Sequence, residues 1–178
     1  MIQHNPDTQR FKEEMRRSLK REARNSRAIN IVKRDHVYSV GEAVGSVYFI
    51  EKGKIKLVLL STSGRECMLA IHTAGDIFGE ICLSGRPGRL ETATAMEDTV
   101  LKQVPCGKFL KRLSKDSLLE GFIKYLAVRV ADQQEVIANL VTVDSEQRLG
   151  QTLLQIARKH GMKDPRSIRI GLRISHEE

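Results

Sequence analysis

Three cysteines are the side chains in this sequence best suited to redox chemistry or soft-metal binding. Cys67, Cys82 and Cys106 lie too far apart along the chain for a Cys-x-x-Cys metal or redox pair. Their odd number argues against a framework of structural disulfides. We therefore expect reduced thiols in or near a protein core.

The sequence lacks the residue patterns that are typical of catalytic sites. It contains no Ser, His and Asp at enzymatic spacing, no metal-ligand set, and no Walker or Rossmann phosphate loop. We predict that the chain is not an enzyme.

The charge of the chain is strongly basic and unevenly distributed. The formal net charge is +8, and residues 1–34 contain ten Lys or Arg against four Asp or Glu. Such a surplus favours contact with polyanions, although a solvated cationic face would carry the same charge.

Hydrophobic residues make up 40% of the chain and charged residues 29%, which is typical of a globular protein. The N-terminal residues lack the apolar stretch and cleavage site of a secretory signal, and no apolar run approaches the roughly 18 residues that cross a bilayer. We expect a cytoplasmic protein without membrane contact.

Functional side chains need secondary-structure elements to position them. The first such element predicted along the chain is an amphipathic helix over residues 8–27, with Asp7 as its N-cap. Its apolar stripe recurs every four positions and consists of Phe11, Met15, Leu19 and Ala23. We expect the stripe to pack on the domain that follows. A membrane-surface helix and an arm that contacts DNA phosphates are the alternatives.

Residues 37–104 have the pattern of short antiparallel strands. Apolar and β-branched runs at 47–50, 54–60 and 67–71 are separated by frequent glycines. Residues 61–66 (STSGRE) are typical of a hairpin turn. This region is predicted to form an all-β roll or barrel.

After Pro105 the pattern becomes helical, first at 108–113 and then over 117–141. In the longer helix two sets of residues repeat every seven positions, as in the a and d seam of a coiled coil. The seam predicts a parallel homodimer, and the alternative is a helix packed on its own roll. The seam residues are Ile123, Leu126, Val130, Gln133, Ile137 and Leu140.

Beyond a break near Thr142, a helix capped by Asp144 or Ser145 is predicted to end at Gly161. A loop over 163–167 and a half-exposed strand over 168–174 follow. Residues 175–178 (SHEE) have the pattern of a capping box, which predicts the start of another helix. We expect these residues to be the beginning of an incomplete second domain.

The order of these elements, together with the segment GDIFGE at 75–80, resembles the Crp/Fnr family of bacterial transcription regulators over nearly all of residues 37–178. The resemblance implies an α+β fold with an antiparallel β roll of double-stranded β-helix or jelly-roll type, flanking helices, a long dimerisation helix and the start of a winged helix-turn-helix. The expected divisions are a basic helical segment (1–34), a cyclic-nucleotide-binding-like roll (35–116), a dimerisation helix with hinge (117–143), and an incomplete DNA-binding domain (144–178).

In nucleotide-binding members of the family, a Gly-Glu pair contacts the sugar and phosphate, which implies such roles for Gly79 and Glu80. The phosphate-binding Arg and its following Ser or Thr align with Glu91 and Thr92. A carboxylate beside a phosphate costs roughly 1 to 4 kcal/mol at about 4 Å. The departure at Glu91 therefore disfavours a cyclic nucleotide in the usual pose.

Four further side chains are candidates for ligand contact. Arg86 and Arg89 would serve as phosphate partners if their loop turned inward; otherwise they pair with Glu91 or face water. Gln133 and Gln134 match positions of adenine contacts in cyclic-AMP-responsive members, since amides both donate and accept. Alternatively, Gln133 sets the helix register and Gln134 faces solvent.

Other cofactors of the family fit the sequence less well. An iron–sulfur cluster requires four thiolates, and a haem would need an axial ligand such as His72, Cys67 or Cys82. Lone residues of these types are more often structural.

The resemblance implies a homodimer that binds double-stranded DNA, with RNA polymerase as a further partner. Because the expected second domain is incomplete, we expect this chain to bind operator DNA weakly. The rival hypotheses are a ligand-binding module that acts on a protein partner and a regulator that needs no ligand.

Overall fold

The structure is a computed structural model that describes residues 6–21, 26–61, 66–142, 145–164 and 167–170. The chain forms two compact units. One comprises Lys12–Leu119, and the other comprises the residues that flank this range.

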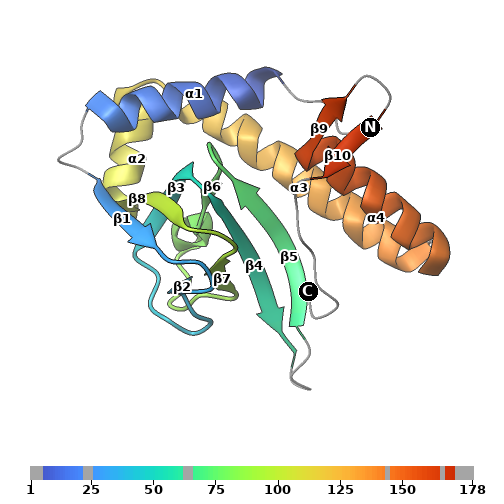
Figure 1. Ribbon diagram of the computed structural model, residues 1–178. Coiled ribbons are helices and arrows are strands. Elements are labelled where there is room, and N and C mark those ends of the chain that lie inside the picture. The colour runs from blue at the N-terminus through green and yellow to red at the C-terminus, as the bar shows by residue number, and fades with distance from the viewer. Residues whose placement is uncertain (1–5, 22–25, 62–65, 143–144, 165–166, 171–178) are drawn as a thin grey trace. The chain divides into compact units, whose positions relative to one another are not determined.

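The Lys12–Leu119 unit contains two four-stranded antiparallel sheets (Figure 1). The first has the spatial order β1 (Arg27–Ile31), β8 (Thr99–Pro105), β3 (Ser46–Lys52) and β6 (Ile77–Phe78). The second has the order β2 (His36–Tyr38), β7 (Thr92–Ala95), β4 (Lys54–Leu60) and β5 (Glu66–Thr73). The predicted α+β fold with an antiparallel roll is confirmed.

Both sheets contribute side chains to one hydrophobic core. In β8, Leu101 is completely buried between less buried neighbours, as the pleat of a strand requires. The core consists of Tyr38, Tyr48, Ile50, Ile55, Leu57, Phe78, Ala93, Ala95 and Leu101. The three strand runs expected at 47–50, 54–60 and 67–71 all lie within strands, and β4 pairs with β5 on either side of the expected hairpin turn.

The N-terminal helix α1 spans Pro6–Arg21, so it ends before the predicted Arg27. Asp7 lies in its first turn and does not precede the helix. Residues 27–31 instead form β1, because the alternating Ile29 and Ile31 pack against the core while the strand pairs with β8.

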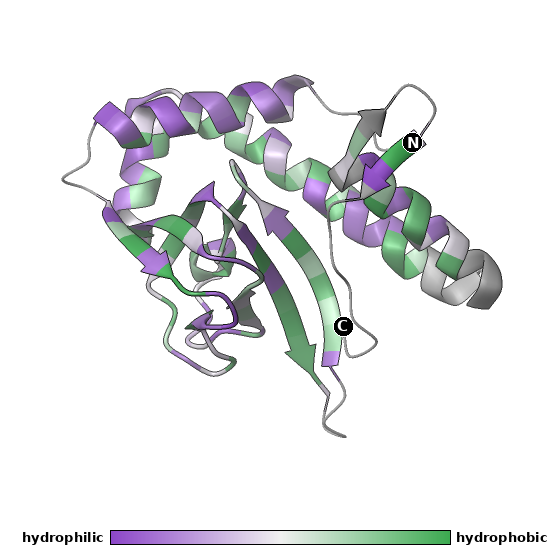
Figure 2. Cartoon of the chain, viewed as in Figure 1, coloured by the Kyte–Doolittle hydropathy of each residue, from purple (hydrophilic) through white to green (hydrophobic). Residues whose placement is uncertain are grey.

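The apolar stripe of α1 is buried, as predicted, although Figure 2 shows that the helix is largely hydrophilic. Phe11, Met15 and Leu19 are at most 2% exposed. The Phe11 ring contacts the Phe122 and Tyr125 rings, with centroids 5.9 Å and 5.5 Å apart. Ala23 lies outside the described residues.

Three helical segments come after β6 in the chain, the first of them before β7. The short 3-10 helix η2 covers Glu80–Ser84, α2 covers Cys106–Lys115, and α3 covers Leu119–Thr142. The helices predicted at 108–113 and 117–141 are therefore present, and the second begins two residues later than expected.

In the flanking unit, α4 spans Ser145–His160 and ends immediately before Gly161, as predicted. The prediction of a loop over residues 163–167 is wrong in part, because β9 (Gly161–Asp164) pairs with β10 (Ser167–Ile170) in an antiparallel hairpin. A Cβ at Gly161 would lie 2.1 Å from the Ala157 carbonyl oxygen, so the strand can begin this close to the helix only with glycine. The expected capping box and most of the strand at 168–174 lie outside the described residues.

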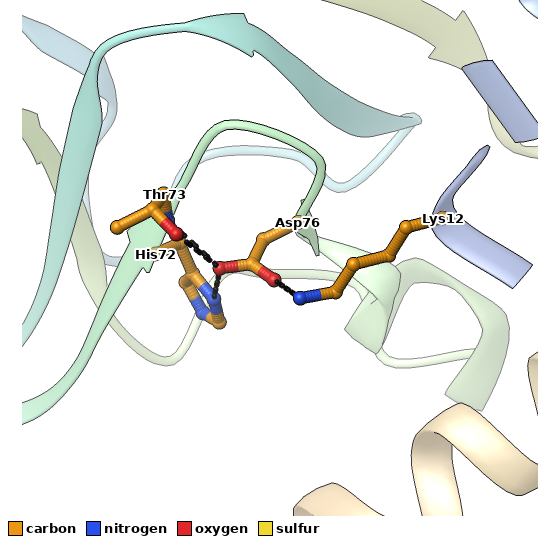
Figure 3. A network of polar contacts seen from close by, with 4 residues as sticks. All are labelled: Lys12, His72, Thr73 and Asp76. Carbon is orange, nitrogen blue, oxygen red and sulfur yellow. Dashed lines mark hydrogen bonds and ion pairs between the residues drawn. The ribbon is translucent and has the colours of Figure 1, made fainter. Parts of the chain in front are cut away.

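A buried ion pair attaches α1 to the segment between β5 and β6 (Figure 3). Lys12 Nζ lies 2.6 Å from Asp76 Oδ1, and the Thr73 backbone N–H donates to Asp76 Oδ2 at 2.8 Å. Burial alone would raise the pKa of Asp76, but Lys12 and His72 outweigh burial and hold this pKa below its ordinary value of 3.8. Asp76 is therefore ionised at neutral pH.

A second buried contact joins α1 to α2. The Arg112 guanidinium donates to the Ser18 carbonyl oxygen at 2.7 Å, and the Ser18 hydroxyl donates to the Asp116 carboxylate. Ser18 and Arg112 are at most 4% exposed. The N-terminal helix is thus held by polar bonds as well as by its apolar stripe.

We expect Asp76→Asn to lower the free energy of unfolding at neutral pH by about 1.5–3 kcal/mol, the range for a hydrogen bond to a charged group. Because the pKa of folded Asp76 is depressed, its contribution is complete above the unfolded pKa of roughly 3.9 and is lost as the pH falls through the folded value. Urea titrations at pH 7 and pH 3 should show that the difference between the two proteins shrinks in acid.

Glu97→Gln is the matched control, because Glu97 forms a more exposed pair with Lys54 at 3.9 Å. This substitution should change stability little at either pH. An Asp76→Asn effect that is equally large at pH 3 would contradict the role of the ionised carboxylate.

Candidate functional site

Gly79 lies where β6 ends and η2 begins, and its backbone has φ 77° and ψ 10°. This left-handed conformation favours glycine. A Cβ would lie 2.9 Å from Arg89 Nη1 and 3.1 Å from Tyr48 Cδ2. Gly79 is therefore needed both for its backbone conformation and for the close approach of Arg89.

Arg89 turns into the roll and is 3% exposed. Its Nη1 donates to the Gly79 carbonyl oxygen at 2.9 Å, and its Nη2 donates to the Ser46 carbonyl oxygen at 2.8 Å. Two backbone hydrogen bonds hold the Arg89 main chain, one to the Glu42 carbonyl (2.9 Å) and one from the Gly41 N–H (2.8 Å). The loop is thus fixed with its arginine pointing inward.

Two tyrosine rings cover the Arg89 guanidinium. Its carbon lies 4.1 Å from the centroid of the Tyr38 ring and 5.7 Å from that of Tyr48. Cation–π contacts of this kind stabilise a desolvated cation by about 2 kcal/mol. The rings therefore offset part of the cost of burying the charge.

Glu91 is 7% exposed, and its Oε1 accepts a hydrogen bond from the Tyr38 hydroxyl at 2.8 Å. Burial, followed by the neighbouring Glu91 carboxylate, raises the pKa of Tyr38 well above its usual range. Tyr38 consequently stays protonated and acts as a donor. Thr92 Oγ1 accepts from the Val40 backbone N–H at 3.1 Å.

We call Tyr38, Tyr48, Gly79, Arg89 and Glu91 the Arg89 cluster. It places one cation and one carboxylate among aromatic rings inside the roll. The Nε of Arg89 is buried and has no hydrogen-bond partner among the described residues, so one donor of the guanidinium is unused. The Glu91 carboxylate, in contrast, already accepts a proton donor.

The structure brings together only some of the predicted ligand residues. Arg89 reaches Gly79, and Glu91 joins them through Tyr38, whereas Arg86 is exposed. Glu80 is partly buried at the start of η2. Gln133 and Gln134 are exposed on α3, in the flanking unit. Ligand contact by any of these residues stays a prediction.

Sequence reasoning missed Tyr38 and Tyr48. Both lie in strands, where an aromatic residue is usually read as a core residue. The chain has three tyrosines, and aromatic residues make up only 4% of it, so the scarcity of tyrosine was the one signal that the sequence offered. Their contact with Arg89 joins segments far apart in sequence, which no local pattern contains.

The candidate haem ligands do not form a common site. His72 is buried and stacks on Phe78 with centroids 6.1 Å apart, whereas Cys67 is exposed and Cys82 is half-buried. Among the described residues there is no group of three or more His, Cys, Asp or Glu placed to hold a metal ion. None of the described helices has the length and apolar character needed to cross a bilayer.

The predicted seam lies along α3. Ile123, Val130 and Ile137 are 57%, 50% and 62% exposed. Leu126 is half-buried, Gln133 is exposed, and the Leu140 side chain lies outside the described ones. Within the part of the chain that the structure describes, the seam is thus an apolar stripe open to solvent.

The profile of the cyclic nucleotide-binding domain matches residues 28–116, which include both sheets of the roll and α2. This match begins within β1. The domain divisions expected from the sequence, with the boundary at residue 35, stay predictions.

Several curated regulators are similar in sequence. The chain is 27% identical over 145 residues to the CRP-like cAMP-activated global transcriptional regulator of Mycobacterium tuberculosis, covering 80% of this chain and 64% of that protein. It is 28% identical to the global nitrogen regulator of Synechococcus elongatus, covering 79% and 65%. The chain thus spans less than two thirds of the length of these relatives.

Solved structures share the fold. A CRP-family transcriptional regulator of Thermus thermophilus is 27% identical, with a TM-score of 0.66 over 84% of this chain and 73% of that one. The c-di-GMP responsive global regulator CLP of Xanthomonas campestris has a TM-score of 0.75 at 19% identity, over 86% and 78%, which shows a common fold alone.

All of the relatives named above are regulators, and none is described as an enzyme. The matched domain contains Gly79, Arg89 and Glu91. Because this profile covers half of the chain and the similar proteins are regulators of one type, the chain belongs to the cyclic nucleotide-binding domain family and, within it, to the Crp/Fnr-type regulators.

Proposed function

We propose that this chain is the sensor and dimerisation portion of a homodimeric, DNA-binding transcription regulator. The roll binds an effector, and α3 passes the change to the DNA-binding domain. The observation that carries the proposal is the exposed apolar stripe of Ile123, Val130 and Ile137, which repeats every seven residues. A seam with β-branched residues at a is the pattern of a parallel two-stranded coiled coil.

Burial of the apolar stripe between two chains supplies the free energy of dimer association. Each buried aliphatic side chain contributes about 1.5–3 kcal/mol relative to an exposed one. The exposed Gln133 lies in the same seam, where a polar residue fixes the register of the two helices. Two-fold symmetry would then place two DNA-binding heads roughly 34 Å apart, in successive major grooves.

The proposed partners beyond the dimer are double-stranded DNA and RNA polymerase, and the proposed location is the cytoplasm. We assign DNA contact to the predicted helix-turn-helix domain, which includes residues 144–178. Support comes from the named relatives, which are transcription regulators.

The Arg89 cluster points to an effector other than a cyclic nucleotide in the usual pose. Glu91 occupies the position of the phosphate-binding arginine, and its buried carboxylate repels an anion. Arg89 is a buried cation in the same cluster, but two backbone carbonyls already hold its guanidinium. A ligand phosphate would therefore have to displace bonds that the free protein already makes.

We expect the chain to be a dimer at micromolar concentration and the double variant Ile123→Lys, Ile137→Lys to be monomeric. Two lysines in a closed seam would place like charges in a desolvated contact. Light scattering coupled to size exclusion measures the mass directly.

The matched control is Ala131→Lys with Ala138→Lys, because these exposed residues are also seven apart and lie outside the seam. This control adds the same charge and should remain dimeric. A monomeric wild-type protein would contradict the proposed dimer and favour a ligand-binding module that acts on a different protein.

Calorimetry should detect no micromolar binding of cyclic AMP or cyclic GMP to the wild-type protein. Glu91→Gln removes the repelling charge and keeps an acceptor for the Tyr38 hydroxyl. We expect this variant to bind at least about fivefold more tightly, because a repulsion of roughly 1 to 4 kcal/mol is removed and 1.4 kcal/mol corresponds to a factor of ten.

Glu51→Gln serves as the control, since Glu51 pairs with Lys102 on another part of the roll at 3.8 Å. It should leave nucleotide affinity unchanged. Micromolar binding by the wild-type protein, or a folded Glu91→Gln protein with no gain, would refute the electrostatic argument.

A further inference from the structure

A run of positive charge on α1 and a second run on α2 have no role in the proposed function. Residues 15–21, in the second half of α1, contain four Arg or Lys and no Asp or Glu. The ten residues of α2 also contain four Arg or Lys and no acidic residue. The basic surplus noted near the N-terminus is thus matched by a helix far along the chain.

Polar contacts hold these two helices side by side (Figure 1). Arg112 in α2 donates to the Ser18 carbonyl oxygen in α1 at 2.7 Å. Asp116, which follows α2 directly, accepts from the Ser18 hydroxyl and lies 3.6 Å from Arg21 Nη2. Both charged runs also lie in the Lys12–Leu119 unit, so their positions relative to each other are fixed.

The exposed cations lie on the side of each helix that faces solvent. On α2, three exposed lysines follow one another at spacings of three and four residues, which places them on one side of the helix. Phe109 and Leu113 are buried on its other side. We call the exposed cations of the two runs the cationic face, which consists of Arg17, Lys20, Arg21, Lys108, Lys111 and Lys115.

The stability of the helices explains only part of this charge. The negative end of a helix dipole stabilises cations in the last turn, which accounts for Lys20, Arg21 and Lys115. Lys108, however, lies in the first turn of α2, where the dipole disfavours a cation and no acidic residue offsets it. Neither Lys108 nor Lys111 forms an ion pair within the described part of the chain. Helix stability therefore does not account for the charge at the start of α2.

The composition of the surface argues against a lipid or an ordinary protein partner. Phe11, Met15 and Leu19 of α1 are buried, so this helix has no apolar face to insert into a membrane. A protein partner is bound through a cluster of aromatic and aliphatic anchors. Among the described residues of both helices, Leu110 is the one large apolar side chain that is exposed.

Duplex nucleic acid matches the surface better. Its phosphates are bound by Lys and Arg without apolar anchors and without readout of the bases. A single strand would need aromatic rings for stacking, but Phe11 and Phe109, the aromatic residues of the two helices, are buried. From Lys108 to Lys115 the helix rises about 10 Å, and a duplex carries about six phosphate charges over that length.

We propose that the cationic face binds the phosphate backbone of double-stranded DNA without sequence preference. This contact is separate from the sequence-specific one assigned to the helix-turn-helix domain. It requires neither an effector in the roll nor a second chain.

The test measures fluorescence anisotropy of a short labelled duplex of arbitrary sequence with the full chain, between about 50 and 200 mM salt. Lys108→Glu with Lys111→Glu should lower the affinity at the lowest salt at least about tenfold. The slope of log affinity against log salt should fall by about two, because each phosphate contact contributes about 0.9. The glutamate at position 108 suits the dipole of α2, so the variant should stay folded.

Arg17→Gln with Lys20→Gln tests the α1 part of the cationic face, and should also lower the salt slope by about two. Lys33→Glu with Lys52→Glu is the matched control for the α2 variant. It makes the same change in net charge at exposed lysines outside both helices, and should leave the salt slope unchanged. Circular dichroism should show equal helix content in all four proteins.

A wild-type protein that does not bind the duplex at low salt would overturn the proposal. So would a control that loses as much affinity as the α2 variant, or an α1 or α2 variant that is folded and binds like the wild type. Tighter binding to poly-glutamate or to vesicles of anionic phospholipid than to the duplex would overturn it in favour of those partners. None of these outcomes depends on the proposed dimer or effector, which light scattering and calorimetry test separately.

Discussion

The Arg89 guanidinium is buried inside the roll, and the surrounding structure is arranged to accommodate its charge. Two carbonyl oxygens accept its protons, one from Gly79 and one from Ser46, and Tyr38 covers its face. A buried charge without such partners would cost several kcal/mol. Glycine at position 79 meets the same constraint, because a Cβ there would lie 2.9 Å from Arg89 Nη1. This cation therefore joins the start of β3, the end of β6 and the loop before β7.

The cluster also departs from the pattern that the resemblance implies for nucleotide-binding members. In that pattern an arginine binds the phosphate, and the resemblance aligns Glu91 with its position. In the structure the Glu91 carboxylate accepts a hydrogen bond from the Tyr38 hydroxyl, and backbone carbonyls accept from two nitrogens of the Arg89 guanidinium. A role of Glu91 or Arg89 in ligand binding stays a prediction.

The sequence predicted most of the roll because strands and amphipathic helices leave local patterns. It failed where a distant contact decided the outcome: Ile29 and Ile31 become a strand because β8 is available as a partner, and residues 161–164 form a strand because β10 pairs with them. The same limit applies to the site. Gly79, Arg89 and Glu91 could be selected by type and by resemblance, but the inward turn of Arg89 and the donor role of Tyr38 each join segments remote in the sequence.

Two separate contacts restrain the short stretch from Asp76 to Glu80. Lys12 holds its beginning through an ion pair, and Arg89 holds its middle at Gly79. The two contacts come from α1 and from the loop before β7, which lie on opposite sides of this stretch in the sequence. The backbone of Glu80, directly after Gly79, is therefore positioned by residues that are remote in the sequence.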